Sequence, residues 1–182
     1  MKGFLSSLLE TVEVAVIAVV SVVIIRTFLV QPFMVSGDSM EPNLENGNYL
    51  LVDELSYQFR NPERGEVIVF RYPENPAVYY IKRIVGLPGE KVEVKGGEVK
   101  IFNPENTDGM ILSENYLPKS FRTSGDVEMN LTDVQYFVMG DNRMYSYDSR
   151  SWGPLDKNLI IGLARFNLWP LNQAKAIAAP IY

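Results

Sequence analysis

The sequence predicts a mostly β fold that follows a single N-terminal transmembrane helix. One long apolar run occupies residues 12–30, whereas every later apolar run is short and is bounded by Gly, Pro or Asn. In addition, the chain contains no heptad pattern, internal repeat or low-complexity tract that would favour a coiled coil or a repeat fold. We therefore expect one membrane helix and a β domain of short strands.

The apolar run has the length and composition of a membrane span. As a helix it would measure roughly 28 Å at about 1.5 Å per residue, close to the ~30 Å hydrocarbon core of a bilayer. No residue from Val14 to Ile25 is charged, and Glu13 and Arg26 lie near the ends, where long side chains reach the headgroups. We expect a short tail at residues 1–11 and an uncleaved anchor helix at 12–30.

A buried strand pair and a cleavable signal peptide both fit the apolar run less well. A strand pair would need turn residues inside the run, and none is present. A cleavable signal peptide would end in a small-x-small site, whereas this run continues through Arg26 to Leu29 before Pro32, which should end the helix. The positive-inside rule scarcely decides the orientation, because Lys2 is offset by Glu10 and Glu13.

Composition argues against several classes of function. The net charge of −5 and the lack of a Lys/Arg-rich run argue against nucleic-acid binding, which needs a basic surface. With no Cys, the chain has no disulfide, thiolate zinc site or Cys nucleophile, and with no His it lacks the commonest general base. No run resembles a calcium-binding loop, and we expect neither a metal nor a cofactor.

Beyond Pro32 the chain is expected to form short strands and turns. Lys95-Gly96-Gly97-Glu98 is the signal of a tight hairpin. The more polar segment 103–130 is expected to be an elaboration on the β core or a partly mobile insert. The expected strands are Tyr49–Val52, Glu66–Arg71, Val78–Val85, Lys91–Lys95, Glu98–Phe102, Gln135–Met139 and Leu159–Phe166.

Ser39 stands in the polar sequence VSGDSMEPNL, residues 35–44, shortly after the apolar run. A serine nucleophile usually depends on a histidine base, and this chain has none. Ser39 is therefore either an ordinary loop serine or a nucleophile whose base is unusual.

Lys82 is the residue that could serve as such a base. It lies in the otherwise apolar strand AVYYIKRIVG, on the face of Val78, Tyr80 and Ile84 if side chains alternate. Arg83 on the other face keeps its proton, whereas burial can lower the pKa of a Lys by up to ~3–5 units. A lowering of ~2–3 units would suffice for a base. The ordinary alternative is a Lys whose ammonium reaches the edge of the sheet.

A polar cluster follows the strand that ends at Met139. In the sequence VMGDNRMYSYDSRSWGPL, residues 138–155, the strand end is followed by a sharp turn. Asp148 and Arg150 can pair and rigidify this loop, and a nearby serine could orient a neutral lysine amine. The alternative is a solvated loop held by Asx turns.

These segments, in this order, resemble the bacterial type I signal peptidases of the Gram-positive, single-anchor kind. The resemblance rests on SGDSMEPNL after the anchor, RGEVIVF followed by YYIKRIVGLPGE, MGDNRMYSYDSRSWGPL, and the IIGLARFNLWP ending. It implies an antiparallel β-sheet catalytic domain of the type shared by signal peptidases and SOS-repressor peptidases, at residues 31–182. A smaller inserted β region would lie around residues 91–134.

The resemblance also implies a Ser/Lys dyad, with Ser39 as nucleophile and Lys82 as general base. Ser146 would hydrogen-bond and orient Lys82, and Asp148 would form a supporting pair with Arg150. The other supporting residues would be Gly140, Asp141 and Asn142, which shape the turn beneath the site, and Met40, which packs beside the nucleophile.

The oxyanion would be bound by the Ser39 backbone N–H and by a second donor that the sequence does not identify. The residue two positions before the nucleophile is Gly37, in the manner of the Gram-positive branch, and Ser36 contributes only if the loop bends. The threonine that usually follows the proline of this motif is Asn43 here.

The resemblance implies that the substrates are signal peptides of exported preproteins, cut after small residues. The catalytic domain would lie on the extracytoplasmic side of the cell membrane, held at the lipid bilayer by its single-pass anchor, with no metal and no nucleic acid as partner. Shallow apolar pockets would admit Ala and reject bulkier residues. Pocket residues are expected among Phe33, Val35, Met40, Tyr80, Ile81, Ile84 and Val85.

The sequence leaves two other functions open. A self-cleaving Ser/Lys peptidase like the SOS repressors would be soluble, and the apolar run at 12–30 argues against it. A membrane-tethered β module that only binds partners would not need an intact set of Ser39, Lys82, Ser146 and Asp148. Turnover that is lost in Ser39→Ala and Lys82→Met would distinguish an enzyme from such a module.

Overall fold

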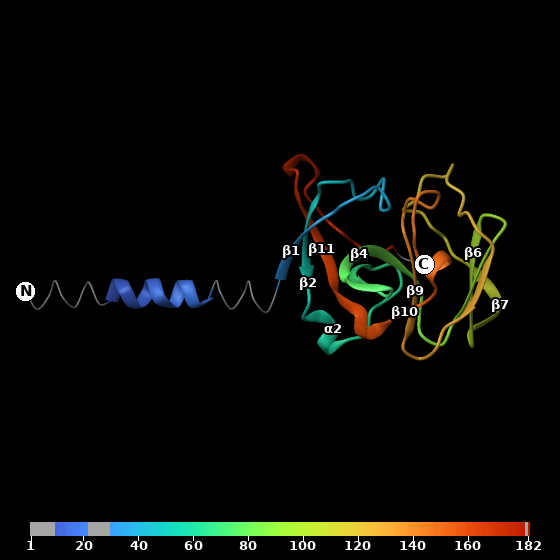
Figure 1. Cartoon of the computed structure of the whole chain (residues 1–182), viewed down its shortest axis with the longest axis horizontal. Helices are drawn as coiled ribbons and strands as arrows, with labels where there is room; N and C mark the ends of the chain where they lie inside the picture. Colours follow the sequence, from blue (N-terminus) through green and yellow to red (C-terminus); the bar gives the residue numbers. More distant parts are fainter. Residues whose placement is uncertain (1–9, 22–29, 181) are drawn as a thin grey trace, which may run out of the picture.

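Two antiparallel β-sheets lie side by side in the part of the chain that the structure describes (Figure 1). The computed structural model describes residues 10–21, 30–180 and 182. In spatial order the larger sheet contains β1 (Val30–Met34), β2 (Tyr49–Asp53), β11 (Ile160–Trp169), β3 (Val67–Tyr72), β4 (Asn75–Gly86), β9 (Gln135–Met139) and β10 (Leu155–Asp156), and β12 (Lys175–Ala176) pairs with β11. The smaller sheet contains β7 (Asn106–Ile111), β6 (Glu98–Asn103), β5 (Lys91–Lys95) and β8 (Val127–Asn130). The short helices are α2 (Ser56–Phe59), α3 (Ser149–Trp152), η1 (Lys157–Leu159) and η2 (Leu171–Gln173).

The hydrophobic core joins the two sheets and fixes β4 in place. Val85 of β4 and Phe137 of β9 pack against Val92 of β5 and Ile101 of β6, so one cluster of buried side chains is shared by both sheets. The second half of β4, residues 82–86, is buried throughout, whereas its first half is largely exposed. A side chain at the boundary between these halves is therefore held rigidly and still lies close to the surface.

The smaller sheet begins with the predicted hairpin. Lys95 pairs with Glu98, which confirms the tight turn at Gly96 and Gly97. Both glycines have positive φ angles, 61° and 88°, which a residue with a Cβ adopts only with strain. Along β5 the valines are buried and their neighbours are more exposed, the alternation of a strand with one face in the core.

All seven predicted strands are present, with ends that differ by three residues at most. The prediction missed β1, β7, β8, β10 and β12. The β7 sequence NTDGMI and the β8 sequence VEMN carry few apolar residues, because both strands lie at the edges of the smaller sheet. Partners in the sheet, rather than local sequence pattern, therefore make these segments strands.

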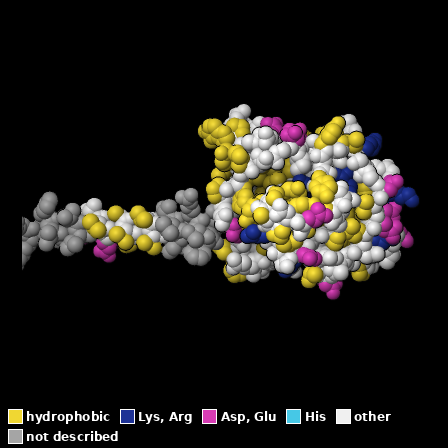
Figure 2. Space-filling view, in the orientation of Figure 1, with side chains coloured by type: hydrophobic (Ala, Val, Ile, Leu, Met, Phe, Trp, Pro, Cys, Tyr) yellow, Lys and Arg dark blue, Asp and Glu magenta, His cyan; other side chains and the backbone are white. Residues whose placement is uncertain are grey.

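The predicted anchor is only partly covered by the described residues. Residues 10–21 are helical and expose hydrophobic side chains along their length (Figure 2), while 22–29 lie outside the described residues. Val30 begins β1 and pairs with Asp53, so it does not end an anchor helix. Pro32 likewise lies within β1, which tolerates a proline because it is an edge strand. Within these residues, no helix combines the length and the apolar character that a membrane span needs.

Segment 103–130 is an elaboration with strands of its own. It supplies β7 and β8, which flank β6 and β5 in the smaller sheet. Between them, residues 112–126 form neither helix nor strand. This β7–β8 connection, residues 112–126, nevertheless makes side-chain hydrogen bonds with the loop that follows β9.

Candidate active site

Ser39 lies in the loop between β1 and β2. The base of this loop is closed by two backbone hydrogen bonds, from Val35 to Asn48 over 2.8 Å and from Gly47 to Val35 over 2.9 Å. Met40, the neighbour of Ser39, is fully buried and packs in the hydrophobic cluster beneath the loop. The loop is thus anchored through its inner side, and Ser39 lies half-buried on its outer side.

The turn after β9 holds the Ser39 loop from the other side. The backbone N–H of Asn142 donates to the carbonyl oxygen of Ser39 over 3.0 Å. The side-chain amide of Asn142 donates to the carbonyl oxygen of Asp38 over 3.1 Å. Two predicted segments far apart in the sequence are therefore joined directly at the backbone of Ser39.

Lys82 reaches Ser39 from the middle of β4. Its Nζ lies 2.7 Å from Ser39 Oγ and donates to the carbonyl oxygen of Ile81 over 2.9 Å. Nζ also lies 5.3 Å from the centroid of the Tyr80 ring. The residue is only 4% exposed, because β3 and β9 flank β4 at this point.

The surroundings of Lys82 favour its neutral form. Burial lowers the pKa of Lys82 to about 8, and the carboxylates of Asp148 and Asp141 oppose this effect only in part. Within the described ranges, no carboxylate lies within salt-bridge distance of Lys82. A substantial fraction of the amine is therefore neutral at mildly alkaline pH and able to accept a proton.

Asp148 and Arg150 form the ion pair expected from the sequence. Arg150 Nε and Nη2 donate to the Asp148 carboxylate over 2.8 and 2.7 Å. The backbone N–H of Gly140 donates to the same carboxylate over 3.0 Å, and Asp148 also caps the start of α3. Burial by itself would raise the pKa of Asp148, but Arg150 and the hydrogen bonds hold this pKa below its usual value. Asp148 is therefore ionised and links the loop that follows β9 to the end of that strand.

Asp141 is fully buried and joins three segments of the chain. It accepts hydrogen bonds from Arg83 Nε and Nη2 over 2.8 and 2.6 Å, and from Asn43 Nδ2 over 2.9 Å. Asn43, which departs from the usual threonine of the motif, thus links the Ser39 loop to the turn after β9. Across the described residues, no group of three acidic side chains is arranged to hold a metal ion.

Ser146 is half-buried with its Oγ shielded from solvent, but it does not make the hydrogen bond expected from the resemblance. In the described part of the chain, Ser146 Oγ has no partner with hydrogen-bond geometry, so it is not bonded to Lys82. The hydroxyl does help to lower the pKa of Asp148. A Cβ at Gly140 would come closer than 3.0 Å to both Ser146 Oγ and the carbonyl oxygen of Ser39. Gly140 therefore provides the space in which these groups meet.

The backbone before Ser39 gives no clear second donor for an oxyanion. The N–H of Gly37 donates to Asn46 Oδ1 over 3.1 Å, and Gly37 has a φ angle of 91°. Ser36 lies at the wall of the adjacent cleft. The second donor that the sequence left open is therefore not identified among these residues.

A cleft of about 320 Å³ opens beside Ser39 and Lys82. Four predicted pocket residues line it, namely Phe33, Val35, Tyr80 and Ile81. Three other predicted residues do not line it. Met40 is buried beneath the loop, Ile84 in the core against β3 and β9, and Val85 between the two sheets. The prediction extended the pocket too far along β4, because the strand passes from the cleft into the core immediately after Lys82.

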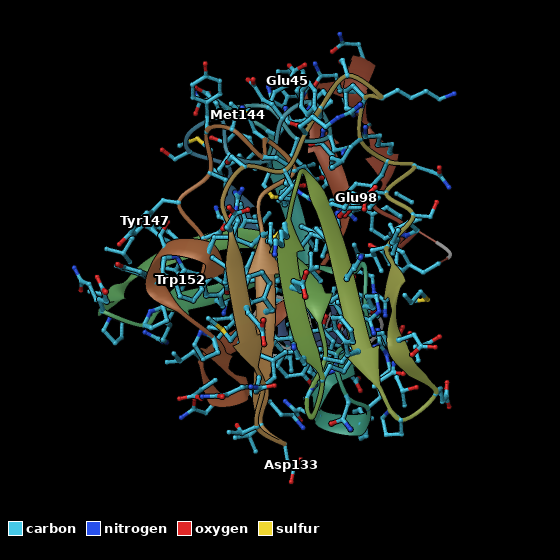
Figure 3. All side chains as sticks on the ribbon, turned by 90° about the vertical axis from the view of Figure 1, so that its right-hand side faces the viewer. Glu45, Glu98, Asp133, Met144, Tyr147 and Trp152 are labelled. Carbon is cyan, nitrogen blue, oxygen red and sulfur yellow. The ribbon has the colours of Figure 1, made fainter. Side chains whose placement is uncertain are left out.

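The cleft also contains residues that the sequence did not indicate. Leu50 pairs with Phe33 across β1 and β2, and Val69 pairs with Ile81 across β3 and β4. Strand pairing is the only signal that could have identified these two. The other additional lining residues are Met34, Tyr79, Tyr145 and Tyr147. Tyr147 lies on the same side of the domain as Trp152 (Figure 3). The rings of both residues contact the ring of Tyr72.

Comparisons with known proteins match most of the chain. A family model described as signal peptidase, peptidase S26, matches residues 8–169. A signal peptidase I from Leptolyngbya laminosa is 37% identical over 182 residues, which cover 96% of this chain and 86% of the relative. A signal peptidase I from Bacillus licheniformis is 35% identical over 180 residues, 93% of each chain. A crystal structure of a signal peptidase I from Enterococcus faecalis V583 is 30% identical, covers 57% of this chain and 97% of that chain, and has a TM-score of 0.48.

Proposed function

Since this chain belongs to the signal peptidase family, peptidase S26, and cleaves signal peptides from preproteins, we propose that Ser39 is the nucleophile of that cleavage and Lys82 its general base. One observation carries this assignment. Lys82 Nζ lies 2.7 Å from Ser39 Oγ, in surroundings where burial brings the pKa of the amine to about 8. The two groups therefore lie at a distance that suits proton transfer, and the amine is neutral in a substantial fraction near pH 8 and above.

The reaction begins when neutral Lys82 takes the proton of Ser39 Oγ and Oγ attacks the carbonyl carbon of the scissile bond. The Ser39 backbone N–H stabilises the oxyanion that forms. The Lys82 ammonium then gives its proton to the leaving amine, the peptide bond breaks, and an acyl-enzyme remains. Lys82, neutral again, takes a proton from a water molecule as the water oxygen attacks the ester carbon. When the ester bond breaks, Lys82 returns this proton to Ser39 Oγ, and the signal peptide leaves with a new carboxylate.

The supporting residues act on this dyad through the loop after β9. The Asp148–Arg150 pair fixes the N–H of Gly140, and Asn142 fixes the carbonyl of Ser39. In the described residues the buried Ser146 hydroxyl makes no hydrogen bond of good geometry, although it influences Asp148, and a small rotation during turnover would let it orient the Lys82 amine. Preorganisation of this kind lowers the cost of reaching the transition state.

The cleft supplies the preference for small residues before the scissile bond. Phe33, Val35, Tyr80 and Ile81 form an apolar wall beside Ser39. A cleft of about 320 Å³ that holds several substrate residues leaves little space for each side chain. Ala fits such a wall without loss, whereas a bulkier residue would displace it.

The anchor is a further part of the proposal. The apolar run would cross the bilayer once as a helix that begins near residue 12 and ends before Val30, the first residue of β1, with the catalytic domain on the extracytoplasmic side. The helical residues 10–21, with exposed Val12, Val14 and Val16, support this arrangement. Alkaline extraction of membranes that contain the full chain, and protease access from each side, would test it.

The test of the dyad is cleavage of a purified preprotein by the full-length protein in detergent, with mass spectrometry to locate the cut. Ser39→Ala and Lys82→Met are run alongside. We expect a cut after a site of the Ala-x-Ala type, lost in both variants. A cut that survives in Ser39→Ala would mean that another residue is the nucleophile.

A further inference from the structure

The β7–β8 connection, residues 112–126, leaves the smaller sheet and packs against the turn that holds Ser39. It contacts this turn mainly through Arg143, the residue after Asn142. Arg143 is buried, and its pKa is raised although burial opposes this, because Glu114 binds it. The β7–β8 connection therefore encloses the guanidinium of Arg143 in the loop that follows β9.

Every nitrogen of the Arg143 guanidinium has an acceptor. Nε donates to the carbonyl oxygen of Gly140 over 3.1 Å. Nη1 donates to Glu114 over 2.6 Å and to Thr123 Oγ1 over 2.8 Å. Nη2 donates to the other Glu114 oxygen and to the Tyr116 hydroxyl, the latter over 2.9 Å. All the bonds from Nη1 and Nη2 go to the β7–β8 connection, and the two to Glu114 form a bidentate pair.

Hydrogen bonds link the β7–β8 connection to the loop of Ser39 through only a few residues. Arg143 holds the carbonyl of Gly140, and Asn142, between them, donates to the carbonyl of Ser39. On the other side, the carbonyl of Tyr116 accepts a hydrogen bond over 3.1 Å from Asn43, which lies in the same loop as Ser39. The connection thus supports both the nucleophile loop and the turn that binds it.

We propose that Glu114 is a positioning residue of the active site, which holds the turn at residues 140–143 through Arg143 and thereby keeps Ser39 in its reactive place. The inference deepens the proposed function of Ser39 and Lys82 and rests on it. Glu114 touches neither substrate nor dyad, so its effect should appear in kcat rather than in KM.

The charge of Glu114 provides a second readout. Lys82 is faced by the carboxylates of Asp148 and Asp141, and Asp141 also interacts electrostatically with Arg143. In Glu114→Gln, Arg143 has lost its counter-charge, so its positive charge is uncompensated and attracts Asp141 more strongly. The extra positive charge lowers the pKa of Lys82, and so does the weaker influence of Asp141 on Lys82. The rise of kcat/KM with pH should therefore move to lower pH. A site that merely loosens would admit water and move this rise to higher pH.

The experiment measures kcat, KM and the pH profile of the full-length protein in detergent, corrected for the folded fraction by circular dichroism. We expect Glu114→Gln to lower kcat by roughly 10- to 100-fold, because a misplacement of about 1 Å can cost that much. Glu114→Asp keeps the charge and should restore part of kcat and the normal pH profile. Glu105→Gln removes an exposed carboxylate of the same region and should match the wild type.

If Glu114→Gln does not fold, Thr123→Val removes a single acceptor of Arg143 and should lower kcat by roughly fivefold or more, since one buried N–H is left unpaired. A kcat and pH profile equal to the wild type in the folded variant would overturn the role of Glu114. Activity that survives in Ser39→Ala would instead overturn the proposed dyad, so the two failures are distinguishable.

Discussion

Lys82 and Arg83 are neighbours on β4 and are equally buried, at 4% and 3% exposure, but only Arg83 is paired with a carboxylate. Arg83 donates twice to Asp141 and once to the carbonyl of Gly65. Lys82 contacts the Ser39 hydroxyl and one backbone carbonyl. Because a buried charge without a counter-charge costs free energy, this arrangement stabilises the arginine as a cation and the lysine as a neutral amine.

The rate of cleavage should rise with pH through about 8. Burial lowers the pKa of Lys82 to about 8, so the amine is mostly protonated and inactive well below this pH and mostly neutral well above it. The measurement is kcat/KM of the full-length protein from about pH 5 to about pH 10, with the folded fraction followed in the same buffers. A flat profile up to about pH 9 would count against Lys82 as the base.

Lys82→Met should abolish cleavage and raise the free energy of unfolding near neutral pH. The pKa of Lys82 is about 8 in the folded protein, below the ordinary 10.5, so the folded state binds fewer protons between these values. Below pH 8 the charged lysine therefore costs up to about 3 kcal/mol, which Met of similar length removes. The lost hydrogen bond to Ser39 offsets part of the gain.

The sign of this effect can be checked by its pH dependence. The advantage of Lys82→Met should be greatest below pH 8 and should vanish as the pH approaches 10.5, where lysine is neutral in both states. Denaturant unfolding of both proteins in the same detergent, at a neutral and an alkaline pH, measures it. A variant that is less stable than the wild type at neutral pH would contradict the buried, unpaired charge.

Gly140→Ala should lower cleavage strongly. The added Cβ would come closer than 3.0 Å to the carbonyl oxygen of Ser39 and to Ser146 Oγ, so the nucleophile loop must move. We expect kcat to fall by about 100-fold, as small displacements of reacting groups do. Gly96→Ala is the control, because a Cβ there meets nothing within 4 Å and the hairpin lies in the smaller sheet. Gly96→Ala should lower the free energy of unfolding and leave kcat unchanged. Equal losses of kcat in the two variants would refute the steric argument.

The two residues of the proposed dyad could be singled out in the sequence because each stands in a local pattern, and the family resemblance then suggested their roles. Ser39 occupies a polar loop after a long apolar run, and Lys82 is a cation in an apolar strand. Local pattern does not show which of two adjacent cations lacks a partner. That depends on Asp141, which lies 58 residues after Arg83 and meets it only when β4 and β9 pair.

Other parts of the site depend on contacts that no local pattern encodes. Glu114 stands in a polar segment without periodicity, and its partner Arg143 follows 29 residues later. Ile84 shares a face with Lys82 if side chains alternate, but alternation does not show where a strand leaves a cleft and enters the core. Val69 enters the cleft only through its pairing with Ile81. Strand pairing and packing, not residue type, decide these positions.

Ile81→Ala should allow the enzyme to accept a bulkier residue before the scissile bond. Ile81 lines the cleft beside the dyad, so removing its side chain beyond Cβ adds space where a small substrate residue would lie. A hydrophobic pocket discriminates by about 10- to 200-fold per methylene. The ratio of kcat/KM for a Val substrate to that for an Ala substrate should therefore rise about tenfold or more. Two peptides that differ only at this position measure the ratio.

Ile84→Ala is the matched control for this change of specificity. The same side chain is removed from the same strand, but Ile84 is fully buried in the core against β3 and β9 and does not line the cleft. Its loss should lower the free energy of unfolding by about 2–5 kcal/mol through the cavity that it leaves. The Val-to-Ala ratio should remain that of the wild type, because no wall of the cleft has moved. If both variants changed the ratio equally, selectivity would follow from general loosening of β4, and the small-residue pocket would not be formed by Ile81.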